Sequence, residues 1–356
     1  MLPLILGLEG STLTDADRER IARYQPTGYI LFTRNIVSAS QTRELTDELR
    51  ELSDHPPLIG IDNEGGRVWR TSGLGPTPPN ASTFGTKGDF KQSAWFGALA
   101  GRHLEMLGVN LNFAPDLDID HEPEEVNALR GRCWGRESQA IIDHAGNFTR
   151  WLRKNGVLSC GKHFPAGGRA RVDPHHDLPI VDSTIEELLA SDLIPYTALE
   201  KELDTIMIAH IRYPNIDSEL PSSLSPRIIT DLLRNQLGYQ GLILTDDLDM
   251  GAITKGYGRG KDFELAWLAG NDLPLLCHEL ATIDRAAEAY EQLPSHIRQD
   301  IEIRLEKKLK KLKTPPAFSQ EKFEKDLSDL SKLTHDLTGQ ESFTTETATQ
   351  SPVEDY

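Results

Sequence analysis

Short apolar runs alternate with amphipathic stretches from the first residue to about residue 290. Each run is rich in Leu, Ile and Val and lacks the strict apolar–polar alternation of a strand that has one face in water. Such runs are typical of strands that are buried on both faces of a parallel sheet. The eight expected strands are Leu2–Leu8, Gly28–Thr33, Pro57–Asp62, Val109–Ala114, Leu158–His163, Thr205–His210, Gly241–Thr245 and Asp272–Cys277.

The stretches between these runs carry helix signals. Leu45, Leu49 and Leu52 follow the i, i+4, i+7 spacing of one helix face. Ser183 and Glu186 have the spacing of a capping box at a helix start. Eight strand–helix units in one chain favour a (β/α)₈ TIM barrel, an α/β fold, over an open doubly wound sheet.

The character of the chain changes after residue 313, where a Thr-Pro-Pro sequence follows. The remainder is rich in Ser, Thr, Glu and Asp and has few aliphatic residues. We therefore expect a single barrel domain over residues 1–313 and an acidic C-terminal tail over 314–356. A short helix around Phe323–Leu333 fits the pattern, and beyond Thr338 we expect disorder, because little apolar surface is available for burial.

Composition narrows the classes of partner and compartment. The 356 residues carry a formal net charge of −17, which argues against nucleic acid or an anionic membrane as the main partner. The three cysteines form no CxxC pair, and the apolar start ends at Glu9 without a basic segment before it, unlike a secretory signal. We expect a cytoplasmic protein with a small-molecule partner. The oligomeric state stays open, with a monomer favoured.

Candidate chemistry gathers where the expected strands end. In a TIM barrel, catalytic side chains stand at the carboxyl ends of the strands and in the loops that follow. Those positions hold Asp62 and Glu64, Asp116, Lys162 and His163 with Asp173, His175 and His176 beyond them, His210, and the pair Asp246 and Asp247. Because all these strand ends meet at one rim, the sequence predicts a single site there.

Each of these residues also has a structural explanation when taken alone. An aspartate after a strand often caps the next helix. A lone histidine such as His210 is often a hydrogen-bonded core residue, and Arg67 or Arg132 could be a solvated surface charge. A metal site is a further alternative, but His175 and His176 are adjacent, and neighbouring residues seldom turn both rings to one ion. We expect no metal and no cofactor.

Four motifs together resemble glycoside hydrolase family 3, in particular its single-domain β-N-acetylglucosaminidases of the NagZ type (β-N-acetylhexosaminidases). They are IGIDNEGGRVWR, GRCWG, GKHFP with the later Asp173-x-His175, and LTDDLDMGAI. The resemblance runs from Leu2 to about Pro294. It implies a glycosidase that removes terminal β-linked N-acetylglucosamine with retention, from peptidoglycan fragments (muropeptides) or chito-oligosaccharides, during cell-wall recycling.

The resemblance also implies roles for individual residues. Asp246 would be the nucleophile, and His175 the general acid/base, oriented by Asp173. The hydroxyls of the terminal sugar would be held by Asp62, Arg132, Lys162 and His163, with His210 lining the site. A histidine suits proton transfer near neutrality, since its unperturbed pKa is about 6.5, and an aspartate on its other nitrogen fixes the tautomer.

The chain departs from the family pattern at three places. Asn63 stands where Gln is usual, and Ala166-Gly167-Gly168 stands where the family has Gly-His-Gly. Pro174 replaces the Ser or Thr between Asp173 and His175; it fixes φ, removes an amide donor and biases Asp173 toward extended backbone. Two alternatives to hydrolysis stay open: a phosphorylase, because a neutral histidine repels phosphate less than a carboxylate would, and a non-catalytic sugar-binding protein.

Overall fold

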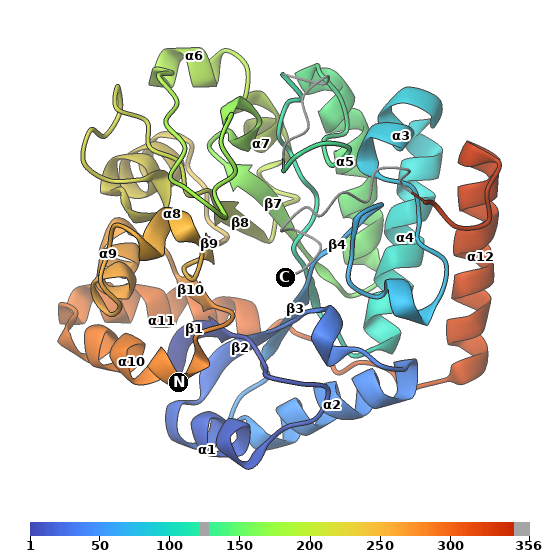
Figure 1. The fold of residues 1–356 in the computed structure, drawn as a ribbon, viewed down its shortest axis with the longest axis horizontal. Helices are drawn as coiled ribbons and strands as arrows, with labels where there is room; N and C mark the ends of the chain where they lie inside the picture. Colours follow the sequence, from blue (N-terminus) through green and yellow to red (C-terminus); the bar gives the residue numbers. More distant parts are fainter. Residues whose placement is uncertain (122–127, 345–356) are drawn as a thin grey trace.

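The computed structural model describes residues 1–121 and 128–344. Eight parallel strands close into a barrel in the order β1-β2-β3-β6-β7-β8-β9-β10, with β10 pairing back to β1 (Figure 1). The expected (β/α)₈ fold and all eight expected strands are thereby confirmed. The strands are β1 (Leu2–Leu6), β2 (Pro26–Leu31), β3 (Leu58–Ile61), β6 (Leu111–Asn112), β7 (Leu158–Phe164), β8 (Thr205–Ile208), β9 (Leu242–Asp247) and β10 (Leu273–Leu276).

Helices surround the barrel and cover the outer face of its strands (Figure 1). Within the described residues, no helix is both long and apolar enough to cross a membrane. The larger ones are α1 (Asp15–Tyr24), α2 (Ala39–Leu52), α4 (Phe90–Met106), α5 (Ser138–Lys154), η5 (Arg227–Gln236), α9 (Lys261–Ala269), α10 (Ile283–Gln292) and α11 (Ser295–Leu309).

Local sequence explains where these helices begin and which face they bury. In α2 the Ser38 side chain caps the first turn, and Leu45 and Leu49 are buried as their spacing predicts. The capping box expected at Ser183 is displaced by one residue. Thr184 caps α6 (Ile185–Leu189), and its partner is Glu187. Two neighbouring registers satisfy the same pattern here, and the observed one buries Leu188 against the core.

A short β-ribbon at the carboxyl end of β3 was not expected from the sequence. It pairs β4 (Asn63–Gly65) with β5 (Val68–Trp69). Gly65 and Gly66 turn the chain with φ of 106° and 58°, a region that side chains with a Cβ rarely adopt. The ribbon is too short to show the alternation of a strand, and it holds Glu64 at the rim of the barrel.

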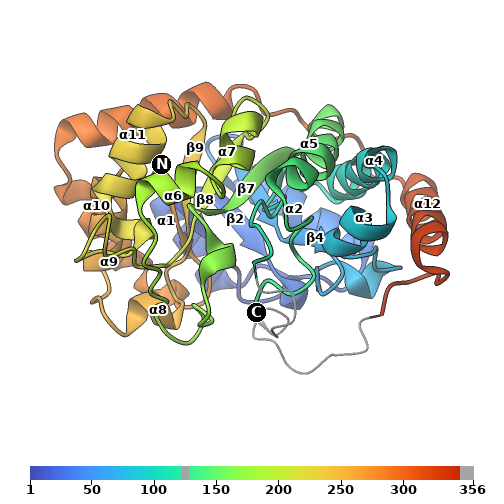
Figure 2. The same cartoon turned by 90° about the horizontal axis from the view of Figure 1, so that it is seen from above.

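A final helix, α12 (Gln320–Thr338), packs against the outer side of α4 (Figures 1 and 2). It is longer than the expected Phe323–Leu333, and it buries Phe323, Leu330 and Leu333. Arg102 of α4 adds an ion pair to Asp326 at 2.7 Å. Most of the expected disordered tail, residues 345–356, lies outside the described residues.

Candidate active site

All eight residues assigned to a site from the sequence line two adjoining hollows at the carboxyl ends of the strands. The first holds Asp62, Arg132, Lys162, His163, His175 and Asp246. The second shares Arg132, His163, His175 and Asp246 with it and adds Asp173 and His210. The structure therefore brings the expected side chains together at one rim.

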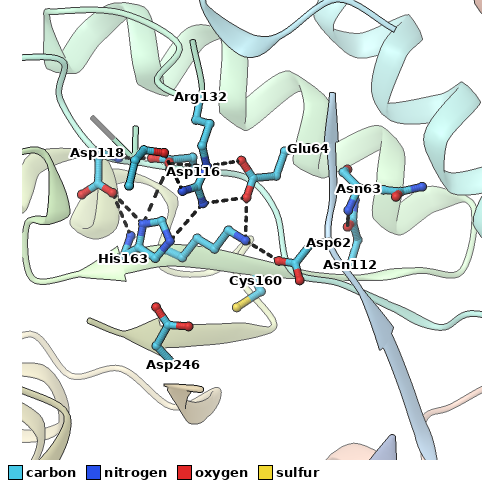
Figure 3. Close-up of polar contacts among 12 residues, drawn as sticks. Asp62, Asn63, Glu64, Asn112, Asp116, Asp118, Arg132, Cys160, His163 and Asp246 are labelled. Atoms are coloured by element: carbon cyan, nitrogen blue, oxygen red, sulfur yellow. Dashed lines mark hydrogen bonds and ion pairs between the residues drawn. The ribbon is translucent and has the colours of Figure 1, made fainter. Parts of the chain in front are cut away.

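One wall of this cleft is a row of paired charges, drawn in Figure 3. Glu64 accepts two hydrogen bonds from Arg132, each 2.8 Å long. The ammonium group of Lys162 lies 2.6 Å from both Glu64 and Asp62. Glu64, Arg132 and Lys162 are 2–6% exposed. Bidentate, charge-assisted contacts of this kind are short and fix geometry as well as charge.

The electrostatics of the row favour the ionised forms of Glu64, Arg132 and Lys162. Burial alone would raise the pKa of Glu64, but Arg132 and Lys162 hold it well below its usual range. Burial would conversely lower the pKa of both cations, but Glu64 and Asp62 hold them above theirs. Arg132 is therefore not a solvated surface charge, and Asp62 serves in an ion pair with Lys162.

His163 is held from both of its ring nitrogens. Its Nδ1 lies 2.8 Å from Asp118 Oδ2, and its Nε2 lies 3.1 Å from the Arg132 guanidinium. Because a guanidinium can only donate, we assign the proton to Nδ1 and leave Nε2 as the acceptor. The ring is thus fixed in one tautomer within the charged row.

Asp116 is a second buried carboxyl beside this histidine. Its Oδ1 accepts from the Asp118 backbone N–H at 2.8 Å, while its Oδ2 lies 3.9 Å from His163 Nδ1 and 3.8 Å from Arg132 Nε. Burial, and then the negative charge of Asp118, raise the pKa of Asp116 well above its usual range. Burial and the neighbouring carboxylate therefore both favour the protonated form of Asp116.

Asp116, Asp118 and His163 also form the one group among the described residues with ligand atoms close enough for a metal ion, all within 4.8 Å. Their donor atoms are already committed. His163 Nδ1 would have to give up Asp118, and the Arg132 charge stands 3.8 Å from Asp116. The donor set therefore fits a metal poorly, and the expectation that none is needed stays a prediction.

Asp246 is the last residue but one of β9 and is partly exposed to the cleft. In Figure 3 it lies below the charged row, with its carboxylate directed toward the row. Burial would raise its pKa, but the imidazoles of His210 and His163, followed by that of His175, outweigh this and lower it. Its neighbour Asp247 behaves in the opposite way. Burial, and then the charge of Asp249, raise the pKa of Asp247 well above the usual value. When two adjacent carboxyl groups have environments that shift their pKa values in opposite directions, the two groups usually have different chemical roles.

His175 and Asp173 form a dyad within one loop. Asp173 Oδ1 accepts from His175 Nδ1 at 2.6 Å and from the His175 backbone N–H at 3.0 Å. Burial would raise the pKa of Asp173, but these hydrogen bonds lower it. Pro174 thus leaves the Asp-x-His contact intact. His176 is exposed and lines neither hollow.

His210 is fully buried, and both of its ring nitrogens have partners. Nδ1 lies 2.7 Å from Ser223 Oγ and Nε2 lies 2.8 Å from the backbone oxygen of Asp247. Neither nitrogen can reach a sugar hydroxyl without losing one of these contacts. His210 is therefore a hydrogen-bonded core residue that also lies beside Asp246 at the edge of the second hollow.

The sequence reasoning did not assign two residues that hold the site together. Glu64 joins Arg132 to Lys162, and Asp118 orients His163. A signal for both was present, because each acidic residue lies two positions after another one, Asp62 or Asp116, at a strand end. What the sequence could not show was which cations these carboxylates would meet.

Comparisons with known proteins identify the family of this chain. Residues 6–311 match the model of the glycosyl hydrolase family 3 N-terminal domain. The β-hexosaminidase of Pseudomonas aeruginosa PAO1 is 34% identical over 292 residues, which cover 82% of this chain and 86% of the relative. The β-hexosaminidase of Chromobacterium violaceum is 35% identical over 287 residues, with 78% and 79% covered. The structure of native NagZ from Neisseria gonorrhoeae is similar with a TM-score of 0.81 at 26% identity, covering 93% of this chain and 97% of that one. The chain therefore belongs to glycosyl hydrolase family 3 and is a glycosidase.

Proposed function

We propose that the protein is a retaining exo-β-N-acetylglucosaminidase, which hydrolyses terminal β-linked N-acetylglucosamine. The observation that carries this proposal is the arrangement of three groups around one cleft. An ionised carboxylate (Asp246) and an Asp–His dyad (Asp173 and His175) both face the space beside the charged row. Retaining hydrolysis requires one group to attack the anomeric carbon and a second to protonate the leaving oxygen.

In the first step Asp246 attacks the anomeric carbon while the glycosidic bond breaks. His175 has to enter this step as an imidazolium: its Nδ1–H donates a hydrogen bond to Asp173, and its Nε2–H gives its proton to the leaving oxygen, which leaves the ring neutral. In the second step the neutral Nε2 takes a proton from water, whose oxygen attacks the anomeric carbon and releases Asp246. The lowered pKa of Asp246 keeps it nucleophilic throughout the neutral range.

The terminal sugar is recognised by the charged row. Asp62, Lys162 and Arg132 present fixed donors and acceptors to its hydroxyls, and their mutual contacts keep them in place before the sugar binds. His163, whose ring nitrogens contact Asp118 and Arg132, lines the same wall and holds the Arg132 guanidinium. The second hollow adjoins His163 and Asp246. Its remaining lining is largely apolar and suits the methyl end of a 2-acetamido group, with Leu129, Ala170, Val172, Ala209 and Ile211 among its residues.

For the biological setting we propose the cytoplasmic recycling of peptidoglycan fragments. Support comes from the three free, buried cysteines, which suit a reducing compartment, and from the likeness to NagZ of Neisseria gonorrhoeae. A barrel over residues 1–313 would be the catalytic unit, with residues 314–356 appended to it.

A panel of aryl β-glycosides tests the proposal, with product anomers resolved by NMR. We expect turnover of the β-N-acetylglucosaminide well above that of the β-glucoside, and β-N-acetylglucosamine as the first product. The α-anomer as first product would contradict the Asp246 nucleophile. Addition of inorganic phosphate provides a further arm, in which release of a sugar 1-phosphate would identify a phosphorylase. No turnover of any member would favour a sugar-binding protein.

A further inference from the structure

The loop that carries His175 rests on the helix that follows the candidate nucleophile. Helix α8 (Gly251–Thr254) begins four residues after the end of β9. The Gly251 N–H donates to the backbone oxygen of His175 at 3.1 Å, and the Ala252 N–H donates to that of Pro174 at 3.2 Å. The candidate acid/base is thus joined through its own backbone to the segment that holds Asp246.

This contact depends on the missing side chain of Gly251. A Cβ at that position would lie 2.6 Å from the backbone oxygen of His176 and 2.8 Å from that of His175. Backbone oxygens give way only if the loop itself moves. Gly251 is not among the residues with positive φ, so its backbone conformation does not demand glycine. The close approach of the loop is therefore the reason for glycine here.

The loop meets the segment that follows Asp246 through these two backbone hydrogen bonds and one ion pair. The bond from His175 to Asp173 orients the ring, but both residues belong to the same loop. In the described part of the chain, residues 170–178 make these two backbone hydrogen bonds to α8, and the residues that follow, Pro179 and Val181, bond to the backbone of Arg212. The ion pair of Lys255 with Asp177 is about two-thirds exposed on both sides, and such pairs contribute little.

We propose that Gly251 is a positioning residue for the acid/base. Because it has no side chain, the loop packs close to α8, and this contact sets the distance between His175 and Asp246 that proton transfer requires. The proposal rests on the proposed function of His175. Gly251 does not line the cleft; its role is to allow the backbone of the loop to pack closely against α8. A methyl group there lifts the loop, so that the leaving oxygen loses its proton donor while the nucleophile and the charged row stay in place.

The test replaces Gly251 with Ala and measures kcat/KM for aryl β-N-acetylglucosaminides of increasing leaving-group pKa. An activated phenolate departs without a proton, so we expect less than about a threefold loss for it and a loss of tenfold or more for a phenyl or alkyl glycoside. For the substrates with poor leaving groups, the fall in kcat/KM at high pH, which reports deprotonation of the acid/base, should also become less steep. Gly258→Ala is the matched control, since a Cβ there meets no atom within 4 Å.

Three comparisons make the result decisive. Equal losses for all leaving groups in Gly251→Ala would overturn the positioning role, because a general structural defect does not depend on the leaving group. His175→Ala measured alongside separates the two proposals: if it shows no leaving-group dependence, the proposed function fails first. Should Gly251→Ala not fold, Ala252→Pro removes the second hydrogen bond at a first-turn position that tolerates proline, and the same selective loss is expected.

Discussion

The charged wall of the cleft and the acid/base loop are built in different ways. The wall residues Glu64, Arg132 and Lys162 come from three separate segments, are at most 6% exposed, and are joined by ion pairs of 2.6–2.8 Å. The loop residues Asp173 and His175 have side chains that are 22% and 16% exposed and contact each other within one short segment. Ion pairs connect the wall residues to one another across separate strand ends, whereas the two loop residues contact each other within the loop.

This difference separates binding from proton transfer. Burying several charges costs much free energy, which is recovered only when every partner is present and well placed. Such a wall is rigid and ready for sugar hydroxyls before they arrive. A proton donor has to reach the leaving oxygen and then admit water, and a loop held by few contacts can do so. Changes in the wall should therefore affect binding and folding, and changes in the loop should affect chemistry alone.

The largest effect is expected where the two regions meet, at Asp246. Asp246→Asn removes the nucleophile and little volume, so kcat should fall by about 10⁴-fold or more while fold and sugar binding remain. Asp247→Asn is the matched control. Burial raises the pKa of Asp247, and its Oδ1 already accepts from the Asp249 backbone N–H, a bond that an amide oxygen also accepts; we therefore expect only a modest change in rate. Near-normal kcat in Asp246→Asn with loss in Asp247→Asn would exchange their roles.

The next effect tests the wall. Glu64→Gln leaves Arg132 and Lys162 buried beside a neutral amide. Removing one partner from a buried ion pair lowers the free energy of unfolding by about 3–5 kcal/mol. We expect a lower free energy of unfolding in denaturant titrations and a higher KM for all substrates alike. Glu9→Gln is the control, since its ion pair with Arg20 is exposed and should matter by less than about 1 kcal/mol. A change that differs between leaving groups would show that the wall takes part in proton transfer.

A more selective effect is expected in the loop. His175→Ala should slow substrates with poor leaving groups by about 10²-fold or more and activated ones far less, with KM for the glycone side little changed. The thermal midpoint should hardly move, since the side chain is partly exposed. His176→Ala should have little effect on any substrate, because that side chain lies outside the cleft. The reverse pattern would place the proton donor one residue further along.

The smallest effect concerns Asp116, whose environment raises its pKa. The folded state then keeps a proton that the unfolded chain releases above about pH 4, so this group lowers stability progressively as the pH rises toward its folded pKa. Asp116→Asn cannot release that proton. We expect little change in unfolding midpoint below about pH 4, and a relative gain for the variant that grows up to about pH 8 and then levels off. A gap that does not change with pH would show that Asp116 is ionised in the fold.

Much of this architecture could be predicted from the sequence because its signals are local. Apolar runs such as Leu158–His163 become strands buried on both faces, and strand ends that carry Asp62, Lys162 and Asp246 meet at one rim in any barrel of this order. The Asp173–His175 contact also spans only two residues. The eight strands and the meeting of the strand-end residues at one rim follow from period, order and spacing, whereas the place of Arg132 in the site was implied by the family resemblance.

The tertiary structure alone decided which charges pair and what the loop rests on. Glu64 meets Arg132 across 68 positions of the chain, and Gly251 receives the loop of His175 from 76 positions away. No local pattern encodes such contacts, because they depend on how strands and loops from separate units are juxtaposed when the barrel closes. The direction in which burial and neighbours shift the pKa of Asp246 or Asp247 is set in the same way. The two residues are adjacent in sequence and become different only in the environment that the closed barrel gives each of them.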